Sequence, residues 1–143
     1  MGLEMKIGED VIIADDVYIK HPNEFSVGNH VAIDKGFYCT TKALIGDYVH
    51  ISPYVTCIGS GKGLLLSKGF NNIMAGARII CGSDRFDDSG LFGAMIPKHL
   101  KGKQIFKPVI LDYFSNIGTN SIVLPESVLR RGVLLCAGSL LMG

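Results

Sequence analysis

The chain has 143 residues, a formal net charge of +1 and 48% apolar residues, with 18 glycines and no tryptophan. This length is that of one domain with a full hydrophobic core. The near-neutral charge and the absence of a run of lysines or arginines argue against a nucleic acid or an anionic membrane as the main partner.

The N-terminal segment MGLEMKIGED predicts no targeting signal. It lacks the apolar stretch of a signal peptide, and no later segment approaches the roughly 20 apolar residues of a membrane span. Lys6 stands where a myristoylation signal needs serine or threonine. We therefore expect a cytoplasmic protein with no membrane span.

A period of six residues begins at once. Ile7, Ile13 and Ile19 are six apart, and a second apolar residue follows the first two after four places, at Val11 and Val17. Such a period fits neither an α-helix nor a simple strand, and it is the hexapeptide signature of a parallel β-helix. Three hexads close one triangular coil of about 18 residues, whose inward side chains stack on the next coil.

The period then runs through residues 27–57 after one interruption. The segment HPNEFS, at 21–26, adds two residues that we expect to bulge at a corner. His21 and His30 fall at turn positions, where a solvated histidine is the favoured interpretation. The predicted inward residues of this stretch are Val27, Ile33, Cys39, Ile45, Ile51 and Cys57.

The four cysteines form no CxxC pair and have no histidine at zinc-ligand spacing. Cys39 and Cys57 are one coil apart, so they should stack inside the core at about the 4.8 Å strand spacing. We predict that Cys39, Cys57, Cys81 and Cys136 are buried free thiols and that the protein binds no metal.

The pattern weakens from residue 59 and vanishes at residue 84. GSGKG, at 59–63, breaks the period, and Ser67 is a poor core residue six places before Ile73. Residues 84–107 mix charge, Gly, Pro and large apolar side chains without any period. A loop of this length is uncommon unless it is functional or disordered, and its apolar residues argue against simple disorder. We expect an arm that forms a site, packs against another subunit, or does both.

Regular hexads return from Pro108 to the last residue. The aliphatic positions are Leu111, Ile117, Val123, Leu129, Leu135 and Leu141. The predicted fold class is therefore all-β, a parallel β-helix that forms one domain over residues 1–143, with residues 84–107 as a protruding loop between coils.

His50 is the candidate for acid–base chemistry. It precedes the inward Ile51 at a corner of a coil, and a glycine-rich turn follows eight residues later. A histidine held rigidly at a corner, facing a neighbouring subunit or loop, can take a proton from a hydroxyl or an amine near neutral pH. A purely structural, hydrogen-bonded histidine accounts for the position equally well.

Three segments in this order resemble the hexapeptide-repeat acyltransferases. They are IGDYVHISPYVTCIGSGKG, IMAGARIICGSD and, after the loop, PVILDYFSNIGTNSIVLPESVLRRGVLLCAGSLLMG. The resemblance covers nearly the whole chain, and it is strongest to the maltose and galactoside acetyltransferase-like sugar O-acetyltransferases of surface-polysaccharide clusters.

This resemblance implies a left-handed β-helix, an exception to the right-handed crossover rule. It also implies a homotrimer with acetyl-coenzyme A, the acyl donor, in the cleft between subunits. His50 matches the family's general base, and Ser83, Asp84 and Arg85 match the acceptor-binding side. The residues that match the ridge under the pantetheine arm are Gly118, Thr119, Asn120, Ala137, Gly138 and Ser139.

The predicted reaction is transfer of an acetyl group to a hydroxyl of a sugar or polysaccharide precursor. Two alternatives stay open: N-acetylation of a nucleotide-linked amino sugar, and a non-catalytic solenoid that serves in binding or assembly. A γ-type carbonic anhydrase shares the solenoid, but it needs three histidines converging on zinc, and the four histidines here have no such spacing.

Overall fold

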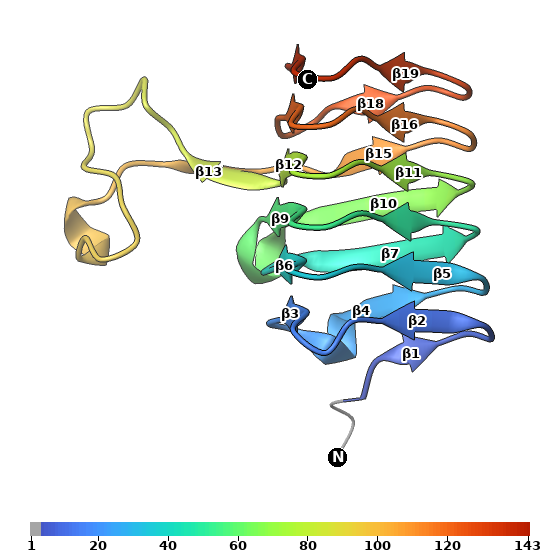
Figure 1. Ribbon diagram of the computed structural model, residues 1–143. Coiled ribbons are helices and arrows are strands. Elements are labelled where there is room, and N and C mark those ends of the chain that lie inside the picture. The colour runs from blue at the N-terminus through green and yellow to red at the C-terminus, as the bar shows by residue number, and fades with distance from the viewer. Residues whose placement is uncertain (1–3) are drawn as a thin grey trace.

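The structure, a computed structural model, describes residues 4–143. Its body is a three-sided prism built from short parallel strands (Figure 1). Sheet A consists of β1 (Lys6–Ile7), β4 (Phe25–Val27), β7 (Lys42–Asp47), β10 (Leu64–Gly69), β15 (Val109–Leu111) and β18 (Val128–Leu129). Sheet B consists of β2 (Val11–Ile13), β5 (Val31–Ile33), β8 (His50–Ile51), β11 (Asn72–Ile73), β16 (Asn116–Ile117) and β19 (Leu134–Leu135). Sheet C consists of β3 (Tyr18–Ile19), β6 (Tyr38–Cys39), β9 (Thr56–Ile58), β12 (Arg78–Ile80), β17 (Ile122–Val123) and β20 (Leu140–Leu141).

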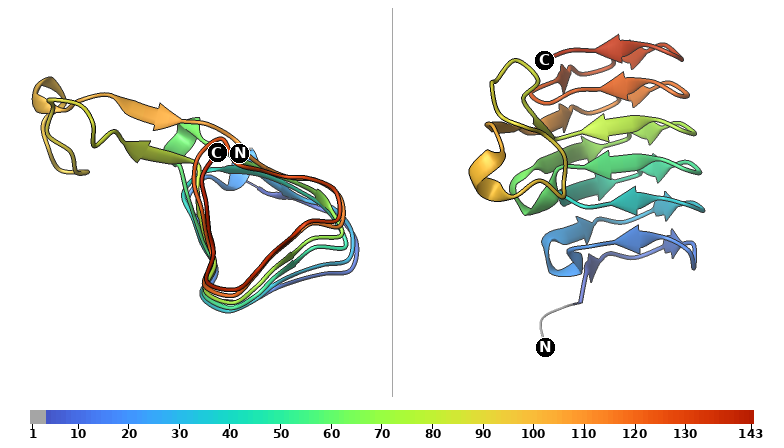
Figure 2. Two further views of the ribbon diagram at one scale, coloured as in Figure 1. Left: turned by 90° about the horizontal axis from the view of Figure 1, so that it is seen from above. Right: turned by 90° about the vertical axis from the view of Figure 1, so that its left-hand side faces the viewer.

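The coil is left-handed, as expected. Seen from the C-terminal end, the chain runs clockwise through sheets A, B and C while it rises towards the viewer (Figure 2). We name the three edges of the prism corner AB, corner BC and corner CA after the sheets that meet there.

The hexad period sets which side chains enter the core. In sheet B, Ile33, Ile51, Ile73 and Ile117 pair in register on successive coils, and all four are buried. Each inward side chain therefore packs between the equivalent side chains of the coils below and above, which is how a solenoid buries apolar surface. The predicted fold class is confirmed.

All three departures from an 18-residue coil lie at corner CA. The register pairs Ile7 with Val27, 20 residues on, and this coil holds the 3-10 helix η1 (Pro22–Glu24). Lys42 pairs with Leu64, 22 residues on, across η2 (Ser60–Lys62). Leu65 pairs with Val109, 44 residues on, across the longest insertion. The insertions therefore stack along one edge and leave the other two corners regular.

The hexad that contains Ser67, where the aliphatic pattern is weak, keeps the same strand register as the other coils. Ser67 lies between Ile45 and Leu111 in sheet A and is buried. Its hydroxyl donates to the Asn71 side-chain oxygen (2.6 Å), and the Asn71 amide nitrogen donates to the main-chain oxygens of Asp112 (2.8 Å) and Ser115 (2.9 Å). A buried polar network thus replaces an aliphatic contact at this coil.

Three of the four cysteines follow the prediction. Cys39, Cys57 and Cys81 are buried free thiols, and Cys39 pairs with Cys57 in register. Hydrogen bonds to the other two thiols, together with burial, raise the pKa of Cys57. The prediction is wrong for Cys136, which is exposed at corner BC because it occupies the turn that follows β19 rather than an inward strand position.

Corner AB carries a ladder of stacked rings. His30, Tyr48, Phe70 and Phe114 occupy equivalent turns of successive coils, with ring centroids 4.7, 4.8 and 4.8 Å apart. All four residues have φ between 53° and 63°, a region that non-glycine residues seldom adopt. Ring stacking helps offset the cost of this backbone conformation, so the ladder stabilises the turn of each coil. No helix in residues 4–143 is long and apolar enough to cross a membrane.

Candidate functional site

A long arm leaves the prism at corner CA (Figures 1 and 2). It departs along β13 (Gly82–Asp84), passes through η3 (Lys98–Leu100) and returns along β14 (Gln104–Phe106). β13 and β14 pair antiparallel, with Ser83 opposite Ile105. This two-stranded ribbon fixes the base of the arm against the coils.

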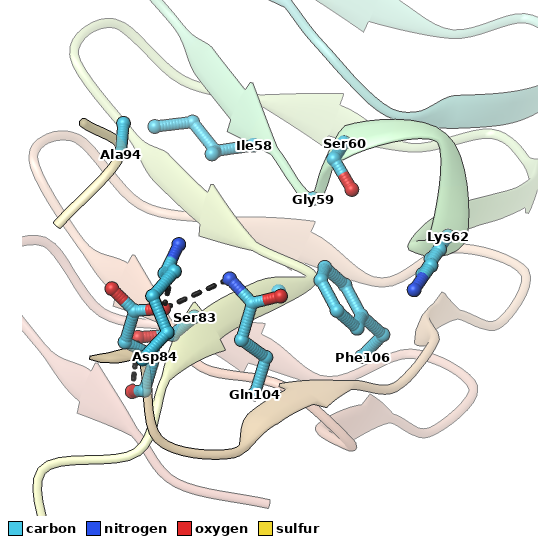
Figure 3. Close-up of a pocket in the computed structure, with 11 residues that line it drawn as sticks. Ile58, Gly59, Ser60, Lys62, Ser83, Asp84, Ala94, Gln104 and Phe106 are labelled. Carbon is cyan, nitrogen blue, oxygen red and sulfur yellow. Dashed lines mark hydrogen bonds and ion pairs between the residues drawn. The ribbon is translucent and has the colours of Figure 1, made fainter. Parts of the chain in front are cut away.

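A cavity of about 430 Å³ lies where the ribbon meets the prism (Figure 3). The coils contribute the outer face of β9 and the η2 turn, and the arm contributes both strands of the ribbon. The lining residues are Ile58, Gly59, Ser60, Lys62, Gly82, Ser83, Asp84, Ala94, Lys101, Gln104 and Phe106.

The ribbon presents a different chemistry on each face. Successive side chains of a strand point to opposite sides, and accordingly Gln104 and Phe106 line this cavity whereas Ile105 lines a second one of about 360 Å³. The second cavity lies towards the C-terminal coils and is mainly apolar, with Ile80, Phe86, Leu124, Pro125 and Met142 among its walls. Ser83 and Asp84 line both cavities.

Asp84 holds the arm together. Its Oδ1 accepts a hydrogen bond from the Gln104 side chain (2.9 Å), and its Oδ2 accepts one from the main-chain N–H of Gly93 (2.7 Å). The ammonium of Lys101 lies 3.7 Å from the same carboxylate. The hydrogen bonds from Gln104 and Gly93, with the charge of Lys101, lower the pKa of Asp84, so this carboxyl is a weak base.

The other two predicted acceptor residues separate. Ser83 lies in the wall shared by the two cavities, and its hydroxyl donates to the main-chain oxygen of Asp84 (2.9 Å). Arg85 instead forms a two-pronged pair with Asp87, with distances of 2.9 and 2.7 Å, and lines neither cavity. The structure therefore brings Ser83 and Asp84 together at the arm's base and places Arg85 farther along the arm.

His50 lies on the outer face of sheet B, away from the arm's cavities. Its Nε2 is 2.7 Å from the Asp34 carboxylate, and 47% of its side chain is exposed. It borders a shallow groove of about 290 Å³ together with His30 and Tyr48. In one copy of the chain His50 does not meet Ser83 or Asp84.

The six predicted cofactor residues lie together at corner BC of the last two coils. Main-chain groups of these residues form hydrogen bonds between successive coils; for example, the Gly138 N–H donates to the Thr119 main-chain oxygen (2.8 Å). Gly118 is required there for packing, because a Cβ at this position would lie 2.5 Å from the main-chain nitrogen of Ala137. Corner BC is not the corner from which the arm leaves.

Of the eleven residues that line the cavity of about 430 Å³, the sequence predicted only Ser83 and Asp84 as site residues. The residues it missed include Lys62, Lys101, Gln104 and Phe106. A signal existed for two of them, because Gln104 and Phe106 flank Ile105 in a polar–apolar alternation typical of a strand with two different faces. Within residues 4–143 no group of three or more His, Cys, Asp or Glu side chains is placed to hold a metal ion.

Comparison with known proteins gives a consistent picture, although no family model matches the chain. The crystal structure of AntD, an N-acyltransferase from Bacillus cereus in complex with dTDP and 3-hydroxybutyryl-CoA, superposes with a TM-score of 0.91, at 30% identity over 98% of this chain and 73% of that one. A serine-to-cysteine variant of AntD in complex with dTDP-4-amino-4,6-dideoxyglucose and coenzyme A gives a TM-score of 0.89, at 30% identity over 96% and 73% of the two chains.

The chain also aligns with the dTDP-4-amino-4,6-dideoxy-D-glucose acyltransferase of Escherichia coli, at 30% identity over 96% of this chain and 71% of that protein. Sequence identity of this extent, together with the shared hexapeptide-repeat solenoid, is sufficient to assign the chain to the family of this enzyme. The chain belongs to the acyltransferases of the hexapeptide-repeat type that include this Escherichia coli enzyme.

Proposed function

We propose that the protein is an N-acyltransferase that moves an acyl group from an acyl-coenzyme A, acetyl-coenzyme A among them, to the amino group of a nucleotide-linked amino sugar. The observation that carries this proposal is the similarity to AntD across almost the whole chain, including the arm. The Escherichia coli relative is an acyltransferase of dTDP-4-amino-4,6-dideoxy-D-glucose, and the AntD variant binds the same dTDP-linked amino sugar. Both findings favour N-acylation over the O-acetylation of a sugar that the sequence first indicated.

The reaction needs a proton acceptor and a positioned thioester. The amine nitrogen attacks the thioester carbonyl carbon, a C–N bond forms and the C–S bond breaks. The coenzyme A thiolate then leaves and is protonated, and the amine proton passes to a base. A positioned base contributes roughly 10²–10⁴-fold to such a step.

We propose His50 as that base. The Asp34 carboxylate fixes the imidazole through Nε2, which leaves Nδ1 free to accept a proton from the acceptor amine. Asp84 is the weaker candidate because its pKa is lowered, and a carboxyl of this kind is better suited to hold a sugar hydroxyl or an ammonium. Coenzyme A would follow corner BC, along the six residues assigned to it from the sequence.

This assignment requires more than one copy of the chain, since His50 and the arm lie on different walls of one prism. We propose a homotrimer in which the outer face of sheet A of one copy packs against sheet B of the next. The outward side chains Leu44, Leu66, Ile110 and Val128 pair in register there and form an aliphatic column on four successive coils. Such a contact brings the arm of one copy beside the neighbour's sheet B and corner BC.

The direct test measures thiol release and amide formation, the latter by mass spectrometry. The purified chain is incubated with acetyl- or 3-hydroxybutyryl-coenzyme A and dTDP-4-amino-4,6-dideoxyglucose. We expect turnover, and a loss of at least about 100-fold in kcat for His50→Ala, because the base is removed. Absence of turnover with every nucleotide-linked amino sugar tested would reject the proposed activity.

Mixed oligomers test whether two copies share the site. His50→Ala and Asp84→Ala chains are each expected to be nearly inactive. After both chains are unfolded and refolded together, mixed oligomers should regain activity, because one pairing joins an intact His50 to an intact arm. If the mixture stays as inactive as its parts, the site lies within one chain and His50 is not its base.

A further inference from the structure

Lys62 is the one cationic side chain in the lining of the cavity of about 430 Å³ beside the arm that has no acidic partner among residues 4–143. Lys101, the other cation, lies against Asp84, whereas no carboxylate of residues 4–143 lies within 4.0 Å of the Lys62 ammonium. The three charged groups of the lining, Lys62, Lys101 and Asp84, leave one positive charge uncompensated. The cavity is therefore suited to an anionic group of its ligand.

The ribbon holds Lys62 over its polar face. The ammonium lies 5.4 Å from the centre of the Phe106 ring, at cation–π distance. Figure 3 shows both side chains at the end of the cavity opposite the Gln104–Asp84 hydrogen bond. The Phe106 ring in turn depends on Gly82, where a Cβ would lie 2.5 Å from the ring. Gly82, Phe106 and Lys62 thus form one packed unit.

The η2 turn that carries Lys62 is also fixed. The Gly63 N–H donates to the Gly59 oxygen (2.9 Å) and closes the four-residue insertion. A Cβ at either glycine would lie 2.7 Å from the Thr41 hydroxyl and within 3 Å of the Cys81 Cβ, so neither position accepts a side chain without movement. Lys62 is therefore an exposed lysine on a turn whose backbone is held in place, and its side chain lines a cavity of about 430 Å³ where a ligand can reach the ammonium.

We propose that Lys62 binds a diphosphate, with the Ser60 hydroxyl and the second N–H of the Gln104 amide as the neighbouring hydrogen-bond donors of the same cavity. This inference rests on the proposed function, in which two ligands carry a diphosphate: the nucleotide-linked acceptor and coenzyme A. The cavity is lined by Ser83 and Asp84, the residues that match the acceptor-binding side, and by none of the six residues assigned to coenzyme A. The diphosphate at Lys62 is therefore expected to be that of the acceptor.

Calorimetry on the full chain tests the assignment with dTDP, thymidine and coenzyme A as probes. Lys62→Ala should weaken dTDP binding by roughly 10- to 100-fold, because a hydrogen bond to a charged group is lost. Thymidine and coenzyme A binding should be unchanged, and Lys62→Arg should restore most of the dTDP affinity. Lys98→Ala is the matched control, because Lys98 lies on the arm but outside the cavity.

The outcomes separate this inference from the proposed function. If Lys62→Ala weakens coenzyme A instead of dTDP, Lys62 still binds a diphosphate but the cavity belongs to the donor. If Lys62→Ala binds both ligands as the unaltered chain does while turnover persists, the inference is overturned and the proposed function stands. If the unaltered chain shows neither turnover nor binding of any probe, both are rejected.

Discussion

At the scale of single residues, the most informative position is the buried Asn71. It sits where the aliphatic repeat fails, and its side chain satisfies the Ser67 hydroxyl and main-chain groups of Gly69, Asp112 and Ser115. A buried polar network is stable only when each member has a partner, since every buried group left without one costs about 1–3 kcal/mol. Asn71 therefore allows a serine to occupy a core position.

Replacing Asn71 with alanine should lower the free energy of unfolding by about 3 kcal/mol or more, because several buried groups lose their partner at once. Urea denaturation measures the change. Asn72→Ala is the matched control: its exposed side chain bonds only Asn116 among the residues described, so a loss under about 1 kcal/mol is expected. Equal losses in the free energy of unfolding at the two positions would show that the buried network stabilises the fold no more than an exposed hydrogen bond does.

At the scale of elements, the arm is stabilised by aspartates rather than by a core of its own. Asp84 receives hydrogen bonds from Gln104 and Gly93, Asp88 from the main-chain N–H groups of Lys103 and Gly90, and Asp87 from Arg85. Each of these partners lowers the pKa of its carboxyl. The arm should therefore respond to acid more than the apolar coils do.

The sign of the pH effect follows from these lowered pKa values. A carboxyl whose pKa is lower in the folded arm contributes stability that is present above about pH 4 and is lost as the pH falls through the folded-state pKa. Hydrogen exchange, corrected for intrinsic rates, should show residues 85–103 losing protection below that pH before β12 does. Asp84→Ala should produce the same loss at pH 7. Uniform protection down to pH 3 would contradict this account.

At the scale of the whole molecule, the outer faces of the three sheets differ. Sheet A presents an aliphatic column on its last four strands, after Lys6 and Ser26 on the first two. The middle of sheet B instead carries His50, Asn72 and Asn116. Apolar side chains that repeat at one outward position do not serve the core of the prism. In the trimer proposed above, they form the face of sheet A that packs against a second copy.

Leu44→Lys tests this contact, because a charge placed in a packed apolar interface is costly. In sedimentation experiments we expect the unaltered chain at three times 15.4 kDa and the variant as a lighter species. Ile122→Lys is the matched control: Ile122 is 41% exposed on the outer face of sheet C, and Leu44 is 47% exposed on sheet A. If both variants remain as large as the unaltered chain, sheet A is not the interface.

The sequence by itself determined the solenoid, its single domain-sized core and the place where the chain departs from it. A hexad repeat is a local pattern, and each inward residue meets its counterpart on the next coil, so the register of Ile33, Ile51 and Ile73 follows from counting. The same counting gave the stacked thiols of Cys39 and Cys57. The prediction of a buried thiol failed for Cys136, because this residue occupies a turn position of its hexad.

Only the tertiary structure decided which of the candidate site residues lie together. Insertions do not follow the hexad period. The sequence of residues 59–63 and 84–107 therefore could not predict that both segments lie at corner CA and enclose one cavity. Lys62 and Phe106 are far apart in sequence and meet only because the coils between them stack. For the same reason the structure separated His50 from Asp84, since they lie on different walls of the prism, a fact that depends on where each coil turns.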